Sequence, residues 1–151
     1  RDEARLYPGI DALLRTVLAD PGVRVGLVTR NVTVEPMETL RCLFARHDID
    51  TAAFDFFACL PLREDKTLHF RRAREHFGIN PARSYACGDE YGDYRAAIGA
   101  AMYPFVVAYG MEDRNRLRER FGVPAEYILP SPQDFAERLL DTLELQGAGC
   151  G

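Results

Sequence analysis

Residues 84–97 read SYACGDEYGDYRAA and organise the rest of the chain. A short apolar run ends at Gly88, and an acidic loop with Asp89, Glu90 and Asp93 follows before an alanine-rich helix begins. Three carboxylates this close to the end of a buried strand repel one another and resist desolvation. A hard cation such as Mg²⁺ would relieve both problems. The alternative is an acidic helix start, which the helix dipole favours, and the loop alone leaves both interpretations open.

Apolar runs alternate with helical patterns along the whole chain. The predicted strands are residues 23–29, 54–59, 84–87 and 103–108, with a brief extended piece at 127–129. Helices are predicted near residues 10–18, 36–44, 66–77, 92–100, 112–121 and 132–143. Strands that are apolar throughout and alternate with helices indicate an α/β fold. We therefore expect a three-layer, Rossmann-like parallel sheet with helices on both faces.

Length and composition favour one compact domain. The chain has 151 residues, of which 47% are hydrophobic, and this is enough for a sizeable core. We expect the domain to span residues 1–146, with residues 147–151 as a flexible tail. A net charge of −4 and a pI near 5.4 give no reason to expect a nucleic acid polymer as partner. No apolar run approaches the roughly 20 residues of a membrane span, so no membrane partner is expected either.

The four cysteines are scattered and never spaced as C-x-x-C. Cys42, Cys59 and Cys87 lie in apolar segments, where a small buried thiol is the usual interpretation. Neither a zinc site nor a disulfide framework is indicated. A cytoplasmic location is therefore the default expectation.

Polar residues follow three of the predicted strands. Residues 29–31 (Thr-Arg-Asn) end the first, Lys66 comes after the second, and the acidic loop follows the third. Ligands of parallel sheets bind beyond the carboxyl ends of the strands, so these groups are expected to converge. A hydroxyl, an ammonium and two carboxylates that hold Mg²⁺ would form a cradle for a phosphoryl group. Each residue also has a plain structural role, Thr29 as a loop hydrogen-bond partner and Lys66 as a solvated helix lysine.

In these motifs the sequence resembles the haloacid-dehalogenase-like hydrolases, which are mostly Mg²⁺-dependent phosphatases. Residues 27–31 (LVTRN) are similar to the second motif of that family, Lys66 to its third, and residues 88–93 (GDEYGD) to its fourth. Supporting phrases are LYPG at residues 6–9 and FGINP at residues 77–81. The resemblance extends from about Leu6 to Leu143.

The resemblance implies a small phosphorylated substrate and the following roles. Lys66 would be catalytic and would bind phosphate together with Thr29, Arg30 and Asn31. Asp89 would hold Mg²⁺ directly, and Asp93 directly or through water. Glu90 would either contact the metal ligands without binding the metal itself or be a solvated loop residue.

One motif of the family is missing from the chain. Its phosphatases form an aspartyl-phosphate on the first aspartate of an Asp-x-Asp motif that ends the central strand of the sheet. Residues 48–50 (Asp-Ile-Asp) have that spacing, but they follow a helix and are rejected. We expect the central strand, the nucleophile and the family's small cap to belong to a segment outside residues 1–151. These residues would then form the C-terminal part of a longer phosphatase.

Two other function classes stay open. The second hypothesis, after the phosphatase, is a phosphatase-like scaffold without catalysis, which recognises a partner or an anion. A weaker alternative is a receiver-like or nucleotide-binding parallel-sheet domain.

Overall fold

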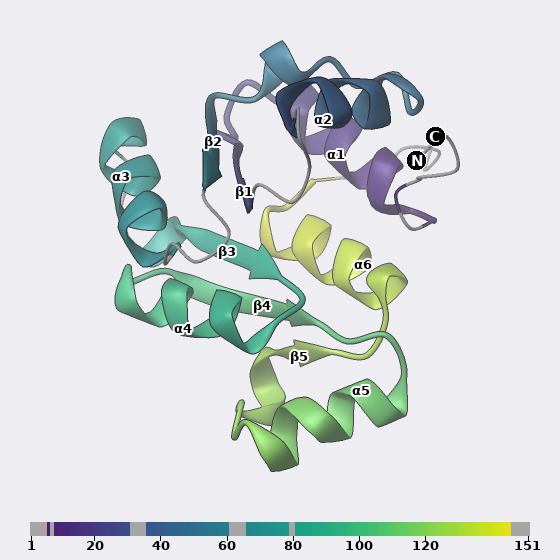
Figure 1. Cartoon of the computed structure of the whole chain (residues 1–151), viewed down its shortest axis with the longest axis vertical. Coiled ribbons are helices and arrows are strands. Elements are labelled where there is room, and N and C mark those ends of the chain that lie inside the picture. The colour runs from purple at the N-terminus through teal and green to yellow at the C-terminus, as the bar shows by residue number, and fades with distance from the viewer. Residues whose placement is uncertain (1–5, 7, 31–35, 61–65, 79–80, 146–151) are drawn as a thin grey trace. The chain divides into compact units, whose positions relative to one another are not determined.

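The computed structural model describes residues 6, 8–30, 36–60, 66–78 and 81–145 (Figure 1). The chain divides into two compact units: unit 1 comprises Arg1–Glu64 and Ala136–Gly151, and unit 2 comprises Asp65–Phe135. The described strands form two parallel sheets, one of two strands in unit 1 and one of three strands in unit 2. Among the described residues, no helix combines the length and the apolar character needed to cross a membrane.

Unit 1 pairs two strands that are separated by a helix. Its elements are α1 (Ile10–Ala19), β1 (Gly26–Arg30), α2 (Pro36–Ala45), the 3₁₀ turn η1 (Thr51–Ala53) and β2 (Phe56–Leu60). The register places Gly26 opposite Phe56. Phe44, Ile49 and Phe54 form the buried cluster beside these elements, with the rings of Phe44 and Phe54 centred 5.4 Å apart.

Unit 2 contains the three-stranded sheet, in the order β3-β4-β5. Its elements are α3 (Thr67–Phe77), η2 (Pro81–Arg83), β3 (Tyr85–Gly88), α4 (Tyr91–Gly99), β4 (Tyr103–Val107), α5 (Met111–Asn115), η3 (Arg116–Arg120), η4 (Ala125–Tyr127) and β5 (Ile128–Leu129). Helix α6 (Pro132–Thr142) begins in this unit and continues into unit 1.

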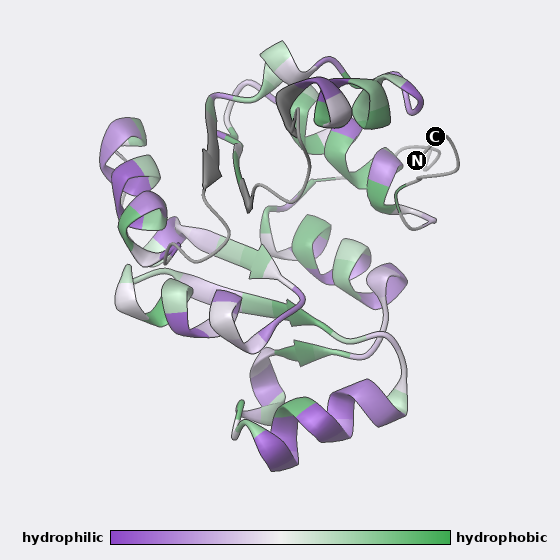
Figure 2. Cartoon of the chain, in the orientation of Figure 1, coloured by the Kyte–Doolittle hydropathy of each residue, from purple (hydrophilic) through white to green (hydrophobic). Residues whose placement is uncertain are grey.

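Side chains of β4 alternate between the two faces of this sheet. Val106 and Ala108 belong to a buried cluster that includes Leu117 after α5, and Tyr91 of α4 packs against it. On the other face Phe105 contacts Phe135 in the first turn of α6, with ring centroids 6.4 Å apart. In Figure 2, the second part of β4 and β5 are green and most of α5 is purple, as expected for a buried sheet covered by an amphipathic helix. The predicted α/β class, with a parallel sheet flanked by helices, is confirmed.

Three local expectations need correction. Cys42 and Cys87 are exposed rather than buried: Cys42 lies within 3.5 Å of the exposed Glu38, and Cys87 alternates with the buried Ala86 along β3. The helix predicted at residues 112–121 starts as α5 and continues as the wider π turn η3. The first strand begins only at Gly26, because the N–H of Val25 donates to the Asp55 carboxylate at 2.8 Å.

Candidate functional site

Helix α3 is hydrogen-bonded to the C-terminal end of α4, and this contact sets the position of Lys66 relative to α4. The guanidinium groups of Arg71 and Arg74 donate to the carbonyls of Gly99 and Ala100, at 2.8 and 3.0 Å. These are carbonyls that the end of a helix leaves without helical partners. Lys66 immediately precedes α3, so its position is set by the same packing.

The ammonium of Lys66 pairs with the third residue of α4. Its Nζ donates to Oδ1 of Asp93 at 2.9 Å, although the two residues are 27 positions apart. The side chains are only 17% and 9% exposed. A pair this far out of water depends on both partners, because removing one leaves the other charge buried and uncompensated.

The second oxygen of Asp93 completes the start of α4. Oδ2 accepts the N–H groups of Asp89 and Glu90, at 3.2 and 3.1 Å. These are amides of the kind that the start of a helix leaves without partners, and an acid at the third helical position satisfies them well. Both oxygens of Asp93 are therefore engaged, one by the helix start and one by Lys66.

Gly88 allows the strand to pass this close to Asp93. A Cβ added at Gly88 would lie 2.4 Å from the carboxyl carbon of Asp93, which is far inside van der Waals contact. Only glycine fits there without displacing the Asp93 side chain. The Gly-Asp pair that ends β3 is thus part of the construction of the site.

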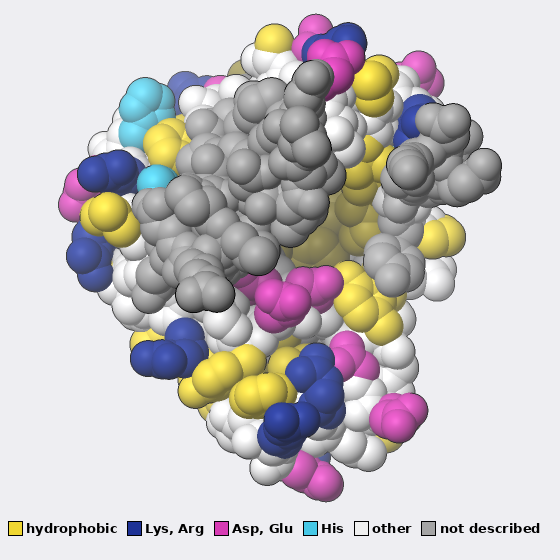
Figure 3. Space-filling view, in the orientation of Figure 1, with side chains coloured by type: hydrophobic (Ala, Val, Ile, Leu, Met, Phe, Trp, Pro, Cys, Tyr) yellow, Lys and Arg dark blue, Asp and Glu magenta, His cyan; other side chains and the backbone are white. Residues whose placement is uncertain are grey.

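Asp89 has a different environment. Its side chain is exposed, and Oδ2 accepts the hydroxyl of Tyr109 at 3.2 Å. Within the described part of the chain, Oδ1 has no hydrogen-bond partner. Figure 3 shows acidic side chains gathered over the region where β3 ends and α4 begins.

The carboxylates suit a magnesium ion unequally. Mg²⁺ keeps several waters and is usually held by one or two carboxylates together with substrate phosphate. Asp89, exposed and with one carboxylate oxygen available, fits that requirement. Asp93 fits only through water, since direct coordination would displace Lys66 or two backbone amides. The described residues contain no group of three His, Cys, Asp or Glu side chains that would hold a metal by themselves.

The structure brings three of the predicted residues together. Lys66, Asp89 and Asp93 lie at the carboxyl end of β3, and Glu90 is an exposed residue directly before α4. Thr29 and Arg30 end β1 in unit 1, opposite Cys59 and Leu60 of β2. Asn31 lies outside the described residues. The approach of residues 29–31 to Lys66 stays a prediction.

Sequence reasoning missed Tyr109. It lies two residues after the end of β4, at the same edge of the sheet as the acidic loop, and its hydroxyl bonds to Asp89. The signal was present, because the rule that ligand sites lie beyond strand ends applies to β4 as well as to β3. A tyrosine there draws less attention than a charged residue.

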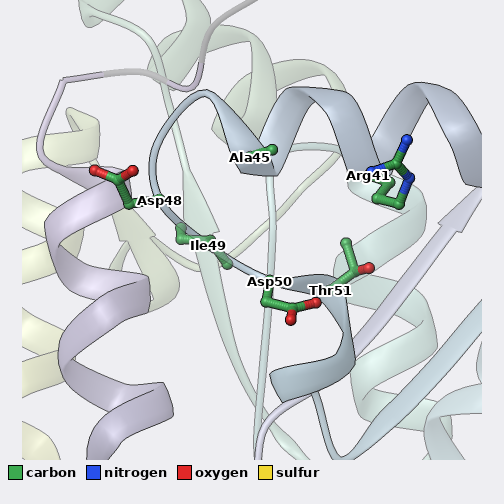
Figure 4. A pocket seen from close by; sticks show the side chains of 6 residues that line it. All are labelled: Arg41, Ala45, Asp48, Ile49, Asp50 and Thr51. Atoms are coloured by element: carbon green, nitrogen blue, oxygen red, sulfur yellow. The ribbon is translucent and has the colours of Figure 1, made fainter.

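An open hollow in unit 1 contains the rejected Asp-Ile-Asp segment. It is lined by Arg41, Ala45, Asp48, Ile49, Asp50 and Thr51 (Figure 4). Asp48 and Asp50 point in different directions there, and the carboxylate of Asp50 accepts the N–H of Ala52 at 2.9 Å. These residues follow α2 and close a turn before η1, so they are not a strand-end acid pair.

No protein-family model and no curated protein matches this sequence. The strongest feature of the candidate site is the ion pair between Lys66 and Asp93 of the acidic loop.

Proposed function

We propose that the chain is the core of a Mg²⁺-dependent phosphomonoester hydrolase of the haloacid-dehalogenase-like kind. One observation carries the proposal: Lys66 and the loop of Asp89 and Asp93, distant in sequence, share one strand end, with an ion pair of 2.9 Å between Lys66 and Asp93. An ammonium beside an available carboxylate is the combination that a phosphate dianion and its cation require.

Each residue has a distinct role in this proposal. Asp89 would hold Mg²⁺, which supplies electrostatic stabilisation of the phosphoryl group. Asp93 holds Lys66 in place, so that the ammonium is oriented before the substrate arrives. Thr29, Arg30 and Asn31 would donate hydrogen bonds to phosphate oxygens. The substrate class is a small phosphorylated metabolite, nucleotide or sugar.

The nucleophile would be an aspartate from a segment outside these residues. It would attack phosphorus and form an aspartyl-phosphate, which water then hydrolyses. Among the described strands, β1 pairs only with β2, and β3 pairs only with β4. Among the described strands, β1 and β3 each keep one edge at which an additional parallel strand could pair.

A scaffold without catalysis is the second candidate. It is favoured by the engagement of both Asp93 oxygens, which takes one of the three loop carboxylates out of direct metal binding. A site that binds an anion through Lys66 needs no nucleophile. The two candidates differ in turnover.

The test is release of phosphate from p-nitrophenyl phosphate by the full natural chain that contains these residues. We expect turnover that depends on Mg²⁺ and is lost in Asp89→Asn. Asp134→Asn is the matched control, because it neutralises an exposed acid at the start of another helix. Turnover that survives Asp89→Asn would contradict the proposal, and a folded full chain without turnover would favour the scaffold.

A further inference from the structure

The backbone around Tyr109 is hydrogen-bonded to the end of β5 and to α5. The amides of the residues before and after it donate to the carbonyls of Leu129 and Pro130, at 2.8 and 3.1 Å. Its own N–H donates to Oδ2 of Asp113 at 2.9 Å. The residue after it is Gly110, whose φ of 107° favours glycine. The backbone of Tyr109 is thus fixed on every side that the described residues show.

This backbone presents the Tyr109 hydroxyl to Asp89. The hydroxyl donates to Oδ2 at 3.2 Å, which leaves Oδ1 as the carboxylate oxygen without a partner among the described residues. The phenol occupies one lone pair of Oδ2, so a cation meets Oδ1 without competition from Tyr109. Bidentate binding would compete with Tyr109 for Oδ2.

Resting on the proposed function, we propose that Tyr109 sets the cation selectivity of the site by keeping Asp89 monodentate. Mg²⁺ has a small octahedral shell and takes a carboxylate through one oxygen, with waters in the other places. Ca²⁺ takes six to eight oxygen ligands and gains from bidentate carboxylates. The bond from Tyr109 to Oδ2 withholds that second oxygen, so it disfavours Ca²⁺ more than Mg²⁺.

Tyr109→Phe tests this selectivity without measuring activity. The variant keeps the ring and removes only the hydroxyl that contacts Asp89. Mn²⁺ is the probe, and its binding to the full chain is measured by water-proton relaxation. Mg²⁺ or Ca²⁺ is then titrated to displace the bound Mn²⁺, which gives the affinity for each ion. Tyr103→Phe is the matched control, since it removes a hydroxyl from the first residue of β4, at the opposite end of the same strand. Asp89→Asn should abolish Mn²⁺ binding.

We expect Tyr109→Phe to shift the ratio of Ca²⁺ to Mg²⁺ affinity towards Ca²⁺ by about two- to tenfold, the value of one hydrogen bond. Tyr103→Phe should leave the ratio unchanged. A variant in which both affinities change by the same factor, or neither changes, would overturn the inference, because a merely structural tyrosine acts on both ions alike. If Mn²⁺ fails to bind the unaltered chain, the metal site of the proposed function is wrong as well. If Mn²⁺ binds and only the ratio stays fixed, the selectivity role alone is wrong.

Discussion

The starts of α4 and α6 each place an aspartate at the third helical position, Asp93 in α4 and Asp134 in α6. At α6, the Ser131 hydroxyl donates to Asp134 at 2.8 Å and accepts its N–H at 3.1 Å. At α4, the carboxylate accepts two backbone amides and also the ammonium of Lys66. Asp134 is exposed, whereas Asp93 is 8% exposed.

The difference between these two helix starts lies in the partner from elsewhere in the chain. Both acids satisfy local hydrogen bonds that any well-formed helix start needs. Both helix starts follow a strand, β3 before α4 and β5 before α6, but only the acid of α4 also balances a charge from elsewhere in the chain, the ammonium of Lys66. The helix-start and functional interpretations of the acidic loop are therefore compatible, because Asp93 serves the helix and Asp89 is left available.

The largest expected effect is on stability, in Asp93→Ala. The variant leaves the Lys66 ammonium and two amides without their partner, which costs about 3–5 kcal/mol of unfolding free energy. Asp134→Ala should cost only about 0.3–1 kcal/mol, because water replaces the lost contacts of an exposed acid. Urea unfolding of the full chain, followed by circular dichroism, measures both. Equal losses would mean that the two helix starts do not differ as described.

Gly88→Ala should have the next largest effect. The added methyl would overlap the Asp93 carboxyl group, so we expect a loss of about 1–3 kcal/mol in unfolding free energy. Gly92→Ala is the control, since a Cβ there meets no atom within 4 Å, and alanine is the better helix former by up to about 1 kcal/mol. Urea midpoints should move in opposite directions. If Gly88→Ala leaves the unfolding free energy unchanged, the Asp93 carboxyl group can move without loss of stability, which would contradict the role given to its position.

A double-mutant cycle of Lys66→Met and Asp93→Asn measures the ion pair itself. We expect a coupling energy of about 1–3 kcal/mol, since the pair is largely buried. The same cycle on Arg116 and Asp113, a more exposed pair within one helical segment, should give about 0.2–1 kcal/mol. If the coupling energy of Lys66 and Asp93 is no larger than that of Arg116 and Asp113, the buried long-range pair is no stronger than an exposed local pair, and the contrast between the helix starts fails.

The smallest expected effect is a pH dependence at Asp113, a third acid in the first turn of a helix. Burial raises the pKa of this carboxyl. Hydrogen bonds from the Tyr109 N–H and the Arg116 guanidinium lower it by more than burial raises it, so the pKa lies below its ordinary value of 3.8. A lowered pKa contributes stability above the unfolded value, and that contribution is lost as the pH falls through the folded value. Asp113→Asn should therefore flatten the fall in melting temperature as the pH drops below about 4, the ordinary pKa range of an aspartate. An unchanged slope would contradict this assignment.

The features that the sequence predicted correctly are mostly local. Gly78 ends α3 with φ 65°, and its N–H donates to the carbonyls of Arg74 and Glu75. Pro132 begins α6 after the Ser131 cap, with Asp134 in the first turn as predicted. These signals depend on neighbouring residues alone, so a single sequence contains all the information they need.

What the sequence could not predict depends on contacts between distant residues. No local pattern indicates that β1 pairs only with β2 among the described strands, because strand pairing is decided by the whole chain. Lys66 was expected at the site, yet its partner could not be chosen among three acids of one loop. The bond from Tyr109 to Asp89 joins the ends of two strands, and spacing alone does not specify it.

The central claim is that a cation binds at Asp89, beside the pair of Lys66 and Asp93. Broadening of backbone amide signals by trace Mn²⁺, in ¹⁵N-labelled full chain, tests it most directly. We expect the amides of Asp89, Glu90 and Tyr109 to broaden first and to recover when Mg²⁺ is added. Broadening that begins instead at the helix starts of Asp113 or Asp134 would contradict the claim.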